Sequence, residues 1–200
     1  MNISKNDVFE YNLYKNVLSK TECEDLIKEF TNYKQARTYS KNLEFDLSYR
    51  KAQKATYDNE SFLLKKVRRI FAEKTNTKIE QQEFPISVVK YELNGEYKEH
   101  HDYYLDLRYV ENPDMGNRWK TVLLYLNDDY EGGETQFPIE KITIKGGQGD
   151  LLIWTNLNKD GTNNTNTLHA GLPVIKGIKY IVVTWIRERM PKNQNNRSLI

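Results

Sequence analysis

The stretch that decides the fold is Lys179-Tyr180-Ile181-Val182-Val183-Thr184-Trp185-Ile186-Arg187, which is rich in β-branched and aromatic residues. This composition is typical of a β-strand. Alternate side chains of a strand point to the same face, so one face is predicted to carry Lys179, Ile181, Val183, Trp185 and Arg187. If Ile181 and Val183 line an interior, the charged residues at both ends of this face point inward as well.

Similar short runs precede this strand from Phe84 onward, separated by clusters of Gly, Asn, Asp and Pro. They predict strands at residues 84–93, 98–104, 119–126, 141–144, 150–154, 167–170 and 179–187. No helical pattern interrupts these strands, which favours a barrel or two packed sheets over a doubly wound parallel sheet. The connections at 106–117 and 156–166 are predicted to be solvated loops.

Helices are predicted before residue 80. Ser19 and Glu22 form a capping box ahead of apolar residues at Cys23, Leu26 and Phe30. A second helix is predicted from a cap at Asp58 or Asn59 to about residue 76. The expected fold class is therefore α+β and mainly β, with a helical support region at 1–80, a catalytic core at 84–187 and a flexible tail at 190–200.

Length and composition limit the class of protein. The chain has 200 residues, which suggests a single domain over 1–200, and its one cysteine excludes an internal disulfide. The net charge of +2 does not suggest nucleic acid as a partner, whereas 14 tyrosines favour a folded domain. The sequence contains no membrane-spanning run and no signal-peptide pattern, so no membrane partner and a cytoplasmic location are expected. The sequence does not predict an oligomeric state.

The strongest chemical signal is the pairing of His100 and Asp102 with the distant His169. On a strand, residues two apart share a face, so His100 and Asp102 could converge on one cation while His101 points to the opposite, exposed face. Two imidazoles and one carboxylate match the facial triad of non-haem iron(II) oxygenases. A chance His-x-Asp is the alternative, and zinc can use the same donors, although the His-Glu-x-x-His zinc motif is absent.

Lys179 is the second signal. A buried ammonium is costly unless an anion meets it, so an inward Lys179 predicts a bound carboxylate or phosphate. Two alternatives remain open: Lys179 caps the strand from solvent, or it pairs with Glu92 or Glu134.

Five segments, taken in order, resemble the prolyl 4-hydroxylase family of iron(II) and 2-oxoglutarate-dependent dioxygenases. They are Tyr91–Asp102, Arg118–Asn127, Glu131–Pro138, Leu168–Lys179 and Thr184–Arg187. The match runs over most of the chain and includes Val17–Cys23 at the entry to the first helix. The resemblance implies a double-stranded β-helix, or jelly-roll barrel, supported by N-terminal helices.

The resemblance also implies roles for individual residues. His100, Asp102 and His169 match the metal ligands. Lys179 matches the residue that pairs with the distal carboxylate of 2-oxoglutarate, and Tyr91 and Thr135 match further partners of that carboxylate. Expected substrate contacts are Tyr97, Arg118, Trp185 and Arg187, and Arg118 is also a candidate catalytic residue.

The implied reaction is hydroxylation of a prolyl residue in a peptide or protein. The implied cofactor is iron(II), with 2-oxoglutarate and O2 as co-substrates, succinate and CO2 as products, and ascorbate as a possible reductant. The alternatives are the same chemistry on a free amino acid, a non-prolyl side chain or another small molecule, and a non-catalytic module that binds proline-rich peptides. The loop at 106–117 is a candidate lid over the substrate.

Overall fold

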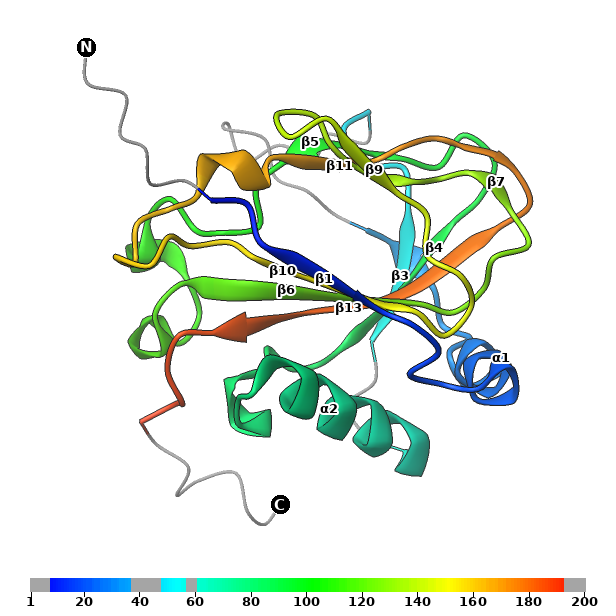
Figure 1. The fold of residues 1–200 in the computed structure, drawn as a ribbon. Helices are drawn as coiled ribbons and strands as arrows, with labels where there is room; N and C mark the ends of the chain where they lie inside the picture. The colour runs from blue at the N-terminus through cyan, green and yellow to red at the C-terminus, as the bar shows by residue number, and fades with distance from the viewer. Residues whose placement is uncertain (1–7, 37–47, 57–60, 193–200) are drawn as a thin grey trace.

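Antiparallel strands form two main sheets in the computed structural model, which describes residues 8–36, 48–56 and 61–192 (Figure 1). Within these residues, the large sheet has the order β1 (Tyr11–Tyr14), β10 (Leu151–Thr155), β6 (Arg118–Tyr125), β13 (Lys179–Arg187), β4 (Ser87–Tyr91), β3 (Gln53–Thr56) and β2 (Lys34–Gln35). The small sheet has the order β5 (Tyr97–His100), β11 (His169–Gly171), β8 (Thr135–Phe137) and β9 (Ile142–Ile144). A further pair joins β12 (Val174–Lys176) to β7 (Glu131–Gly132).

Helices α1 (Lys20–Glu29) and α2 (Phe62–Thr75) lie on the side of the large sheet opposite the small sheet (Figure 1). The predicted capping box of α1 is confirmed, because Ser19 Oγ accepts from the Glu22 amide and the Glu22 carboxylate accepts from the Ser19 amide. Ser61 caps α2, with its Oγ accepting from the Leu64 amide. The predicted caps Asp58 and Asn59 lie outside the described residues. Short 3-10 turns occur at Ile79–Gln81, Leu107–Tyr109, Pro113–Met115 and Thr165–Thr167.

Strand β13 separates two hydrophobic cores, as its period of two predicts. Val182 and Ile186 pack in the core between the large sheet and the helices. Ile181 and Val183, on the other face, belong to the core between the two sheets. The side chains of Lys179 and Arg187 are also buried. This face of β13 therefore looks into the space between the sheets, where the site described below lies.

The predicted strands differ from the observed ones in three respects. The region 1–80 is not only helical, because β1 and β3 pair with β10 and β4, and β2 pairs with β3. Three short strands, β7, β8 and β12, were not predicted, since two or three residues carry too little periodicity. Strand β5 ends at His100, so Asp102 does not share a strand face with it. The described part of the predicted tail, residues 190–192, has no regular structure, and 193–200 lie outside the described residues.

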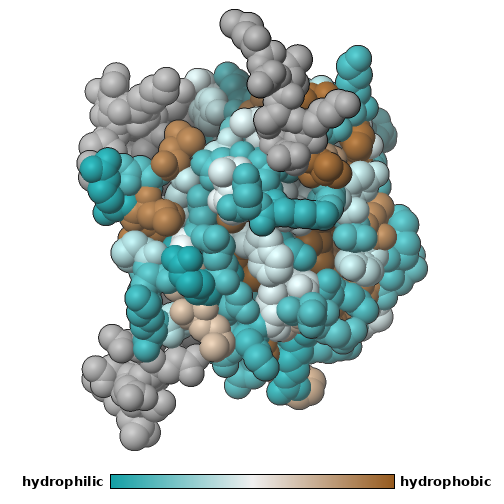
Figure 2. Space-filling model, turned by 60° about the vertical axis from the view of Figure 1, so that its left-hand side comes forward, coloured by the Kyte–Doolittle hydropathy of each residue, from teal (hydrophilic) through white to brown (hydrophobic). Residues whose placement is uncertain are grey.

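One face of the molecule shows how polar and apolar residues are distributed on the surface. The face drawn in Figure 2 is largely hydrophilic, with hydrophobic residues in small separate areas. Such single exposed apolar residues are ordinary in folded domains. Neither α1 nor α2 is long and apolar enough to cross a membrane, and the same holds for every helix in the described ranges.

Candidate active site

Three side chains that are distant in sequence converge between the two sheets. The pairing of β5 with β11 sets His100 opposite His169, and Asp102 follows β5 directly. His100 Nε2 lies 3.7 Å from Asp102 Oδ1, and His169 Nε2 lies 3.5 Å from Asp102 Oδ2. One donor atom from each of the three residues lies within 4.8 Å of the others. This is the only such group of His, Cys, Asp and Glu side chains among the residues that the structure describes.

Hydrogen bonds orient both imidazoles toward the carboxylate. His100 Nδ1 lies 2.7 Å from the Lys98 carbonyl, and His169 Nδ1 lies 2.9 Å from the Thr167 carbonyl. A carbonyl can only accept, so each Nδ1 carries the proton and each Nε2 keeps its lone pair for a ligand. The pattern of ring Nδ1–H bonded to a backbone carbonyl is typical of metal-bound histidines.

Burial and mutual charge keep these groups in the forms that bind a metal. Burial, reinforced by the neighbouring His169, holds the pKa of His100 well below its ordinary value, so its ring is neutral at neutral pH. Burial alone would raise the pKa of Asp102, but the two imidazoles, Arg118 and the hydrogen bond from Thr121 together lower it. A neutral imidazole and an ionised carboxylate are the required ligand states. The donor set therefore fits an iron(II) ion.

Two residues that the sequence analysis missed support the carboxylate. Thr121 Oγ1 donates to Asp102 Oδ2 at 2.6 Å and accepts from Asn156 Nδ2 at 2.9 Å. Both residues are fully buried. The prediction that residues 156–166 form a solvated connection is wrong for Asn156 and Asn164, whose side chains are buried and hydrogen-bonded. A buried polar residue in the middle of apolar β6 was the available signal for Thr121.

His101 stands beside this group rather than in it. Its ring stacks on Tyr103 with centroids 4.6 Å apart, and it is half-buried. Burial lowers the pKa of His101. The prediction of an exposed His101 is therefore wrong, because the chain turns after His100 and packs the ring against Tyr103.

A buried lysine lies at the other end of the same interior. Lys179 is 3% exposed, and its Nζ donates to the Gly133 carbonyl at 2.6 Å. Burial lowers the pKa of Lys179 to about 8. Within the described residues, no carboxylate lies within 4.0 Å of this ammonium, and Glu92 pairs with Lys90 instead. These contacts exclude capping from solvent and direct pairing with Glu92 or Glu134.

Two tyrosine rings lie near Lys179. Register sets Tyr91 on β4 opposite Lys179 on β13, and Lys179 Nζ lies 5.4 Å from the Tyr91 ring centroid and 5.6 Å from that of Tyr125. The Tyr125 hydroxyl lies 3.1 Å from Thr135 Oγ1. Burial raises the pKa of Tyr125 to about 12, so it remains a hydrogen-bond donor. An ammonium and neutral hydroxyls can together bind a carboxylate.

Tyr125 was not predicted as a site residue. It lies on β6, two strand periods from Thr121, so the alternation of β6 places both on the interior face. That alternation was the signal that could have identified Tyr125. Tyr91 lies near Lys179, and Thr135 contacts Tyr125. The carboxylate-binding roles that the resemblance implies for Tyr91, Thr135 and Lys179 stay predictions.

The expected substrate contacts divide into two groups. Tyr97 stacks on His100 with centroids 3.5 Å apart, and the Arg118 guanidinium carbon lies 3.5 Å from the Trp185 ring centroid. Arg118 Nη1 also lies 3.4 Å from the Asp102 carbonyl. Tyr97, Arg118 and Trp185 therefore lie beside the three candidate metal ligands, and all three are half-buried.

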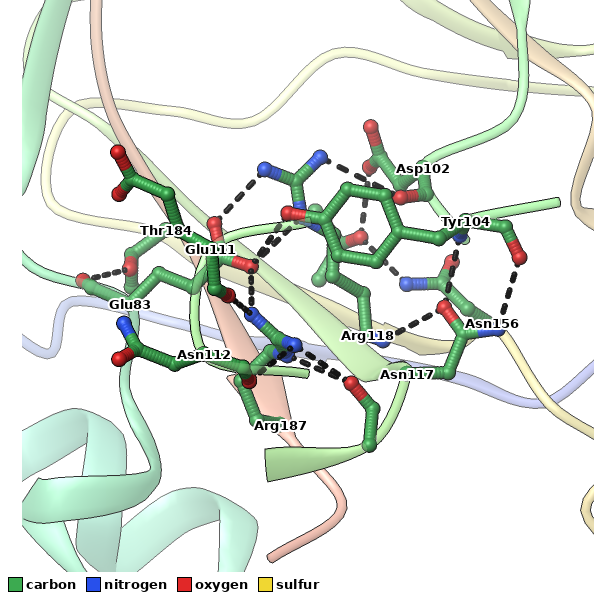
Figure 3. Close-up of polar contacts among 12 residues, drawn as sticks. Glu83, Asp102, Tyr104, Glu111, Asn112, Asn117, Arg118, Asn156, Thr184 and Arg187 are labelled. Carbon is green, nitrogen blue, oxygen red and sulfur yellow. Dashed lines mark hydrogen bonds and ion pairs between the residues drawn. The ribbon is translucent and has the colours of Figure 1, made fainter. Parts of the chain in front are cut away.

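Arg187 lies elsewhere. It is 2% exposed, and it donates to the backbone carbonyls of Glu111, Asn112 and Gly116. Figure 3 shows these bonds. The prediction that Arg187 contacts substrate is not supported by this arrangement, because its donors bond to the 106–117 loop and its side chain is covered. The second half of the candidate lid is thus attached to β13.

Cavities lined by described residues open at the surface. One of about 410 Å³ lies next to the candidate site and is lined by Tyr49, Glu96, Tyr97, Lys98, Glu99, Gln136, Ala170, Gly171, Leu172 and Pro173. A larger one of about 580 Å³ includes Trp119 and Lys120 but none of the predicted site residues. The lining of neither cavity includes His100, Asp102, His169 or Lys179, and only the smaller one includes a predicted site residue, Tyr97.

Comparison with known proteins gives the same assignment. Residues 86–187 match the model of the 2OG-Fe(II) oxygenase superfamily. Prolyl 4-hydroxylase 1 of Arabidopsis thaliana is 33% identical over 117 residues, which cover 52% of this chain and 41% of the relative. Prolyl 4-hydroxylase subunit alpha-1 of Caenorhabditis elegans is 37% identical over 117 residues, covering 58% of this chain and 21% of the relative. The chain thus spans less than half the length of both relatives.

A solved structure extends the match to the fold. The viral collagen prolyl hydroxylase of Paramecium bursaria Chlorella virus-1, in complex with 2OG, superposes with a TM-score of 0.69 and 26% identity. The match covers 88% of this chain and 95% of the viral one. The expected jelly-roll fold and the resemblance to prolyl 4-hydroxylases are therefore confirmed. The chain belongs to the 2OG-Fe(II) oxygenase superfamily.

Proposed function

We propose that this chain hydroxylates a prolyl residue in a peptide or protein, with oxidation of 2-oxoglutarate to succinate and CO2. The observation that carries the proposal is the convergence of His100, Asp102 and His169 at one end of an interior whose other end holds the buried Lys179. The match to prolyl 4-hydroxylases over the same segment supports a prolyl target.

The metal would be held by Nε2 of His100, Nε2 of His169 and the carboxylate of Asp102. When bound, iron(II) and 2-oxoglutarate supply the oxidising chemistry that activates O2 and places one of its oxygen atoms on a substrate carbon. The protein contributes ligand orientation: the Lys98 and Thr167 carbonyls set the two rings, and Thr121 sets the carboxylate. Phe137 and Trp154 pack against His169 and help to exclude water.

Lys179 would pair with the distal carboxylate of 2-oxoglutarate, with hydroxyl donors from Tyr91, Thr135 and Tyr125. A bound dianion would replace the carbonyl of Gly133 as the main partner of a buried ammonium, which explains why an otherwise costly charge is present. The same contact would point the keto end of the co-substrate toward the metal ligands and limit it to one orientation.

The substrate would enter beside Tyr97 and Trp185, whose flat rings offer apolar faces to a pyrrolidine ring. Arg118 has donors near the Asp102 carbonyl and could bind a peptide carbonyl there. The cavity next to Tyr97 is open to solvent and could take residues that flank the target proline. A role for ascorbate and a cytoplasmic location stay predictions from the sequence.

The test is incubation with iron(II), 2-oxoglutarate, O2 and a collagen-like Gly-Pro-Pro repeat peptide. We expect a peptide mass gain of one oxygen for each succinate formed. The matched controls are the His169→Ala variant and the same peptide with alanine in place of proline. Succinate release without peptide oxidation would contradict a peptide substrate and favour a free amino acid or another small molecule. Peptide binding without succinate release would favour the non-catalytic module.

A further inference from the structure

The carboxylate of Glu83 lies at the centre of a largely covered charge cluster, and the proposed function does not use it. Its Oε1 and Oε2 accept from Arg118 Nε at 2.9 Å and from Arg118 Nη2 at 2.7 Å. Oε1 also accepts from Arg187 Nη1 at 3.2 Å and from the Tyr104 hydroxyl at 2.9 Å. Figure 3 shows these contacts around one carboxyl group.

The backbone of Glu83 is attached to β13 next to Trp185. Its amide donates to the Trp185 carbonyl at 2.8 Å, and its carbonyl accepts from Thr184 Oγ1 at 2.9 Å. Because both backbone polar groups are engaged, the residue has little freedom to move relative to the strand. The carboxylate is therefore a rigid acceptor for the two arginines.

The pairing with Glu83 sets the orientation of Arg118. A bidentate contact through Nε and Nη2 fixes the plane of the guanidinium, which then packs against the rings of Trp185 at 3.5 Å and Tyr104 at 4.5 Å. In this orientation Nη1 is directed to the carbonyl of Asp102, a candidate metal ligand. Burial lowers the pKa of Arg118, but its bond to Glu83 more than offsets this effect.

Glu83 also bonds to the arginine that anchors the loop. Arg187 contacts Glu83 through Nη1 and the carbonyls of Asn112 and Gly116 through its other nitrogens. One carboxylate thus balances two guanidinium groups, that of the half-buried Arg118 at the candidate site and that of the buried Arg187 under the loop. Without this carboxylate the two like charges would repel one another in a poorly screened environment.

We propose that Glu83 is a positioning residue that orients Arg118 for the substrate and, through Arg187, couples that orientation to the loop at 111–116. The inference rests on the proposed function, because it assumes that Arg118 contacts a peptide. In the part of the chain that the structure describes, the Glu83 carboxylate bonds to Tyr104, Arg118 and Arg187 and to neither the candidate metal ligands nor Lys179. Its loss should therefore affect the peptide and spare 2-oxoglutarate.

The central test compares Glu83→Gln with wild type. Glutamine keeps the shape but removes the charge and one acceptor. With iron(II) and 2-oxoglutarate bound under anaerobic conditions, we expect the dissociation constant of the Gly-Pro-Pro peptide to rise by about tenfold or more. In turnover assays, kcat/KM for the peptide should fall by a similar factor. The KM for 2-oxoglutarate and the rate of peptide-independent succinate release should change by less than about twofold.

Two further variants separate positioning from general damage. Glu83→Asp keeps the charge, and we expect its peptide affinity to lie closer to wild type than to Glu83→Gln. Glu131→Gln removes a carboxylate from an exposed pair with Lys176 and should leave all these values unchanged. Peptide affinity of a folded Glu83→Gln protein equal to that of wild type would overturn the proposal.

A measurement made without substrate separates the test of the Glu83 role from the test of prolyl hydroxylation. The arginine Nε–H signals in ¹⁵N spectra, assigned with Arg118→Lys, report whether Arg118 is hydrogen-bonded. We expect the Arg118 signal to shift and exchange faster in Glu83→Gln, and to recover partly in Glu83→Asp. An unchanged Arg118 signal would refute the positioning role. A wild-type protein that oxidises no peptide would refute the proposed function, while this spectrum would still decide whether Glu83 orients Arg118.

Discussion

At the scale of single residues, the candidate metal site depends on side chains that do not touch the metal. Thr121 donates to Asp102, and the carbonyls of Lys98 and Thr167 determine which ring nitrogen of each histidine is protonated. The two carbonyls raise the basicity of the rings, and all three contacts hold the orientation of the ligands. The geometry of the three ligands is therefore a property of six or more groups acting together.

Replacing Thr121 with valine tests this dependence. Valine has nearly the same shape but cannot donate to Asp102, and it leaves Asn156 Nδ2 without its acceptor. We expect iron(II) affinity to fall by about 10- to 100-fold, with an unchanged KM for 2-oxoglutarate at saturating iron. Thr143→Val, at an exposed position of β9, is the matched control. If the two variants bound iron(II) with equal affinity, the hydrogen bond from Thr121 to Asp102 would not contribute to metal binding.

The buried lysine makes a pH-dependent prediction. Its pKa of about 8 means that Lys179 loses its proton at a pH well below the usual 10.5. We expect the KM for 2-oxoglutarate to be flat below pH 8 and to rise above it, because the neutral amine attracts a carboxylate less well. Steady-state assays across this range measure the effect, with the KM for peptide as the internal comparison. A flat KM for 2-oxoglutarate through this range would contradict the assignment.

The lowered pKa of Lys179 also makes the free energy of unfolding depend on pH, and here a higher pH is favourable. Between pH 8 and 10.5 the unfolded chain carries the Lys179 proton and the folded chain without co-substrate does not. The contribution of this group to the free energy of unfolding therefore rises with pH in that window. Below pH 8 both states are protonated, and the folded protein bears the cost of a buried charge.

At the scale of elements, strand register and turns decide which side chains meet. The pairing of β13 with β4 sets Lys179 beside Tyr91, and that of β11 with β8 sets Gly171 opposite Thr135. The turn between β9 and β10 also determines where a site side chain can lie. A Cβ added at Gly146 would lie 2.1 Å from Cδ2 of Tyr125, whose ring is fully buried. The absence of a side chain at Gly146 thus allows Tyr125 its position.

Gly146→Ala should therefore displace Tyr125 from Thr135. We expect a loss of about 1–3 kcal/mol in the free energy of unfolding, as for other overpacked cores, together with a higher KM for 2-oxoglutarate. Gly147→Ala is the adjacent control, because its Cβ would have no neighbour closer than 3.4 Å. Chemical denaturation and steady-state kinetics measure the two effects. If both variants behave alike, the close approach of Gly146 to Tyr125 has no functional consequence.

At the scale of the whole molecule, the site joins parts that could otherwise separate. The candidate ligands come from the small sheet and the bend after it, whereas Lys179, Thr121 and Tyr125 come from the large sheet. Ligands that bind between the sheets should therefore stabilise the entire domain, since they bind the folded state only.

Thermal unfolding measures this coupling. At about 100 times the dissociation constant, each ligand should add about 2.7 kcal/mol, and for a chain of this size each kcal/mol raises Tm by about 2–4 °C. We expect iron(II) under anaerobic conditions to raise Tm of wild type and 2-oxoglutarate to raise it further. His169→Ala should lose the metal-dependent rise. Lys179→Met should keep that rise and lose the increment from 2-oxoglutarate. An increment that persists in Lys179→Met would assign the anion to another residue.

Features that depend on short-range regularity could be predicted from the amino-acid sequence. The period of two in β13 placed Lys179 and Ile181 on the interior face, and the capping box located the start of α1. The ordered motifs identified His100, Asp102 and His169 as a group, and the structure brings them together. These features are readable because backbone geometry repeats over a few residues and because a metal restricts which side chains can bind it.

The contacts between distant polar groups could not be predicted in this way, because they depend on the folded arrangement of the sheets. Thr121 and Asn156 are 35 positions apart, and Glu83 and Arg187 are 104 positions apart, yet each pair is hydrogen-bonded. The role of Arg187 also depends on distant contacts. The order of the motifs suggested that Arg187 contacts substrate, whereas in the fold it anchors the loop at Gly116. Such contacts follow from sheet order and register, and these are set by the packing of the whole core, because a shift of one residue would exchange the faces of a strand.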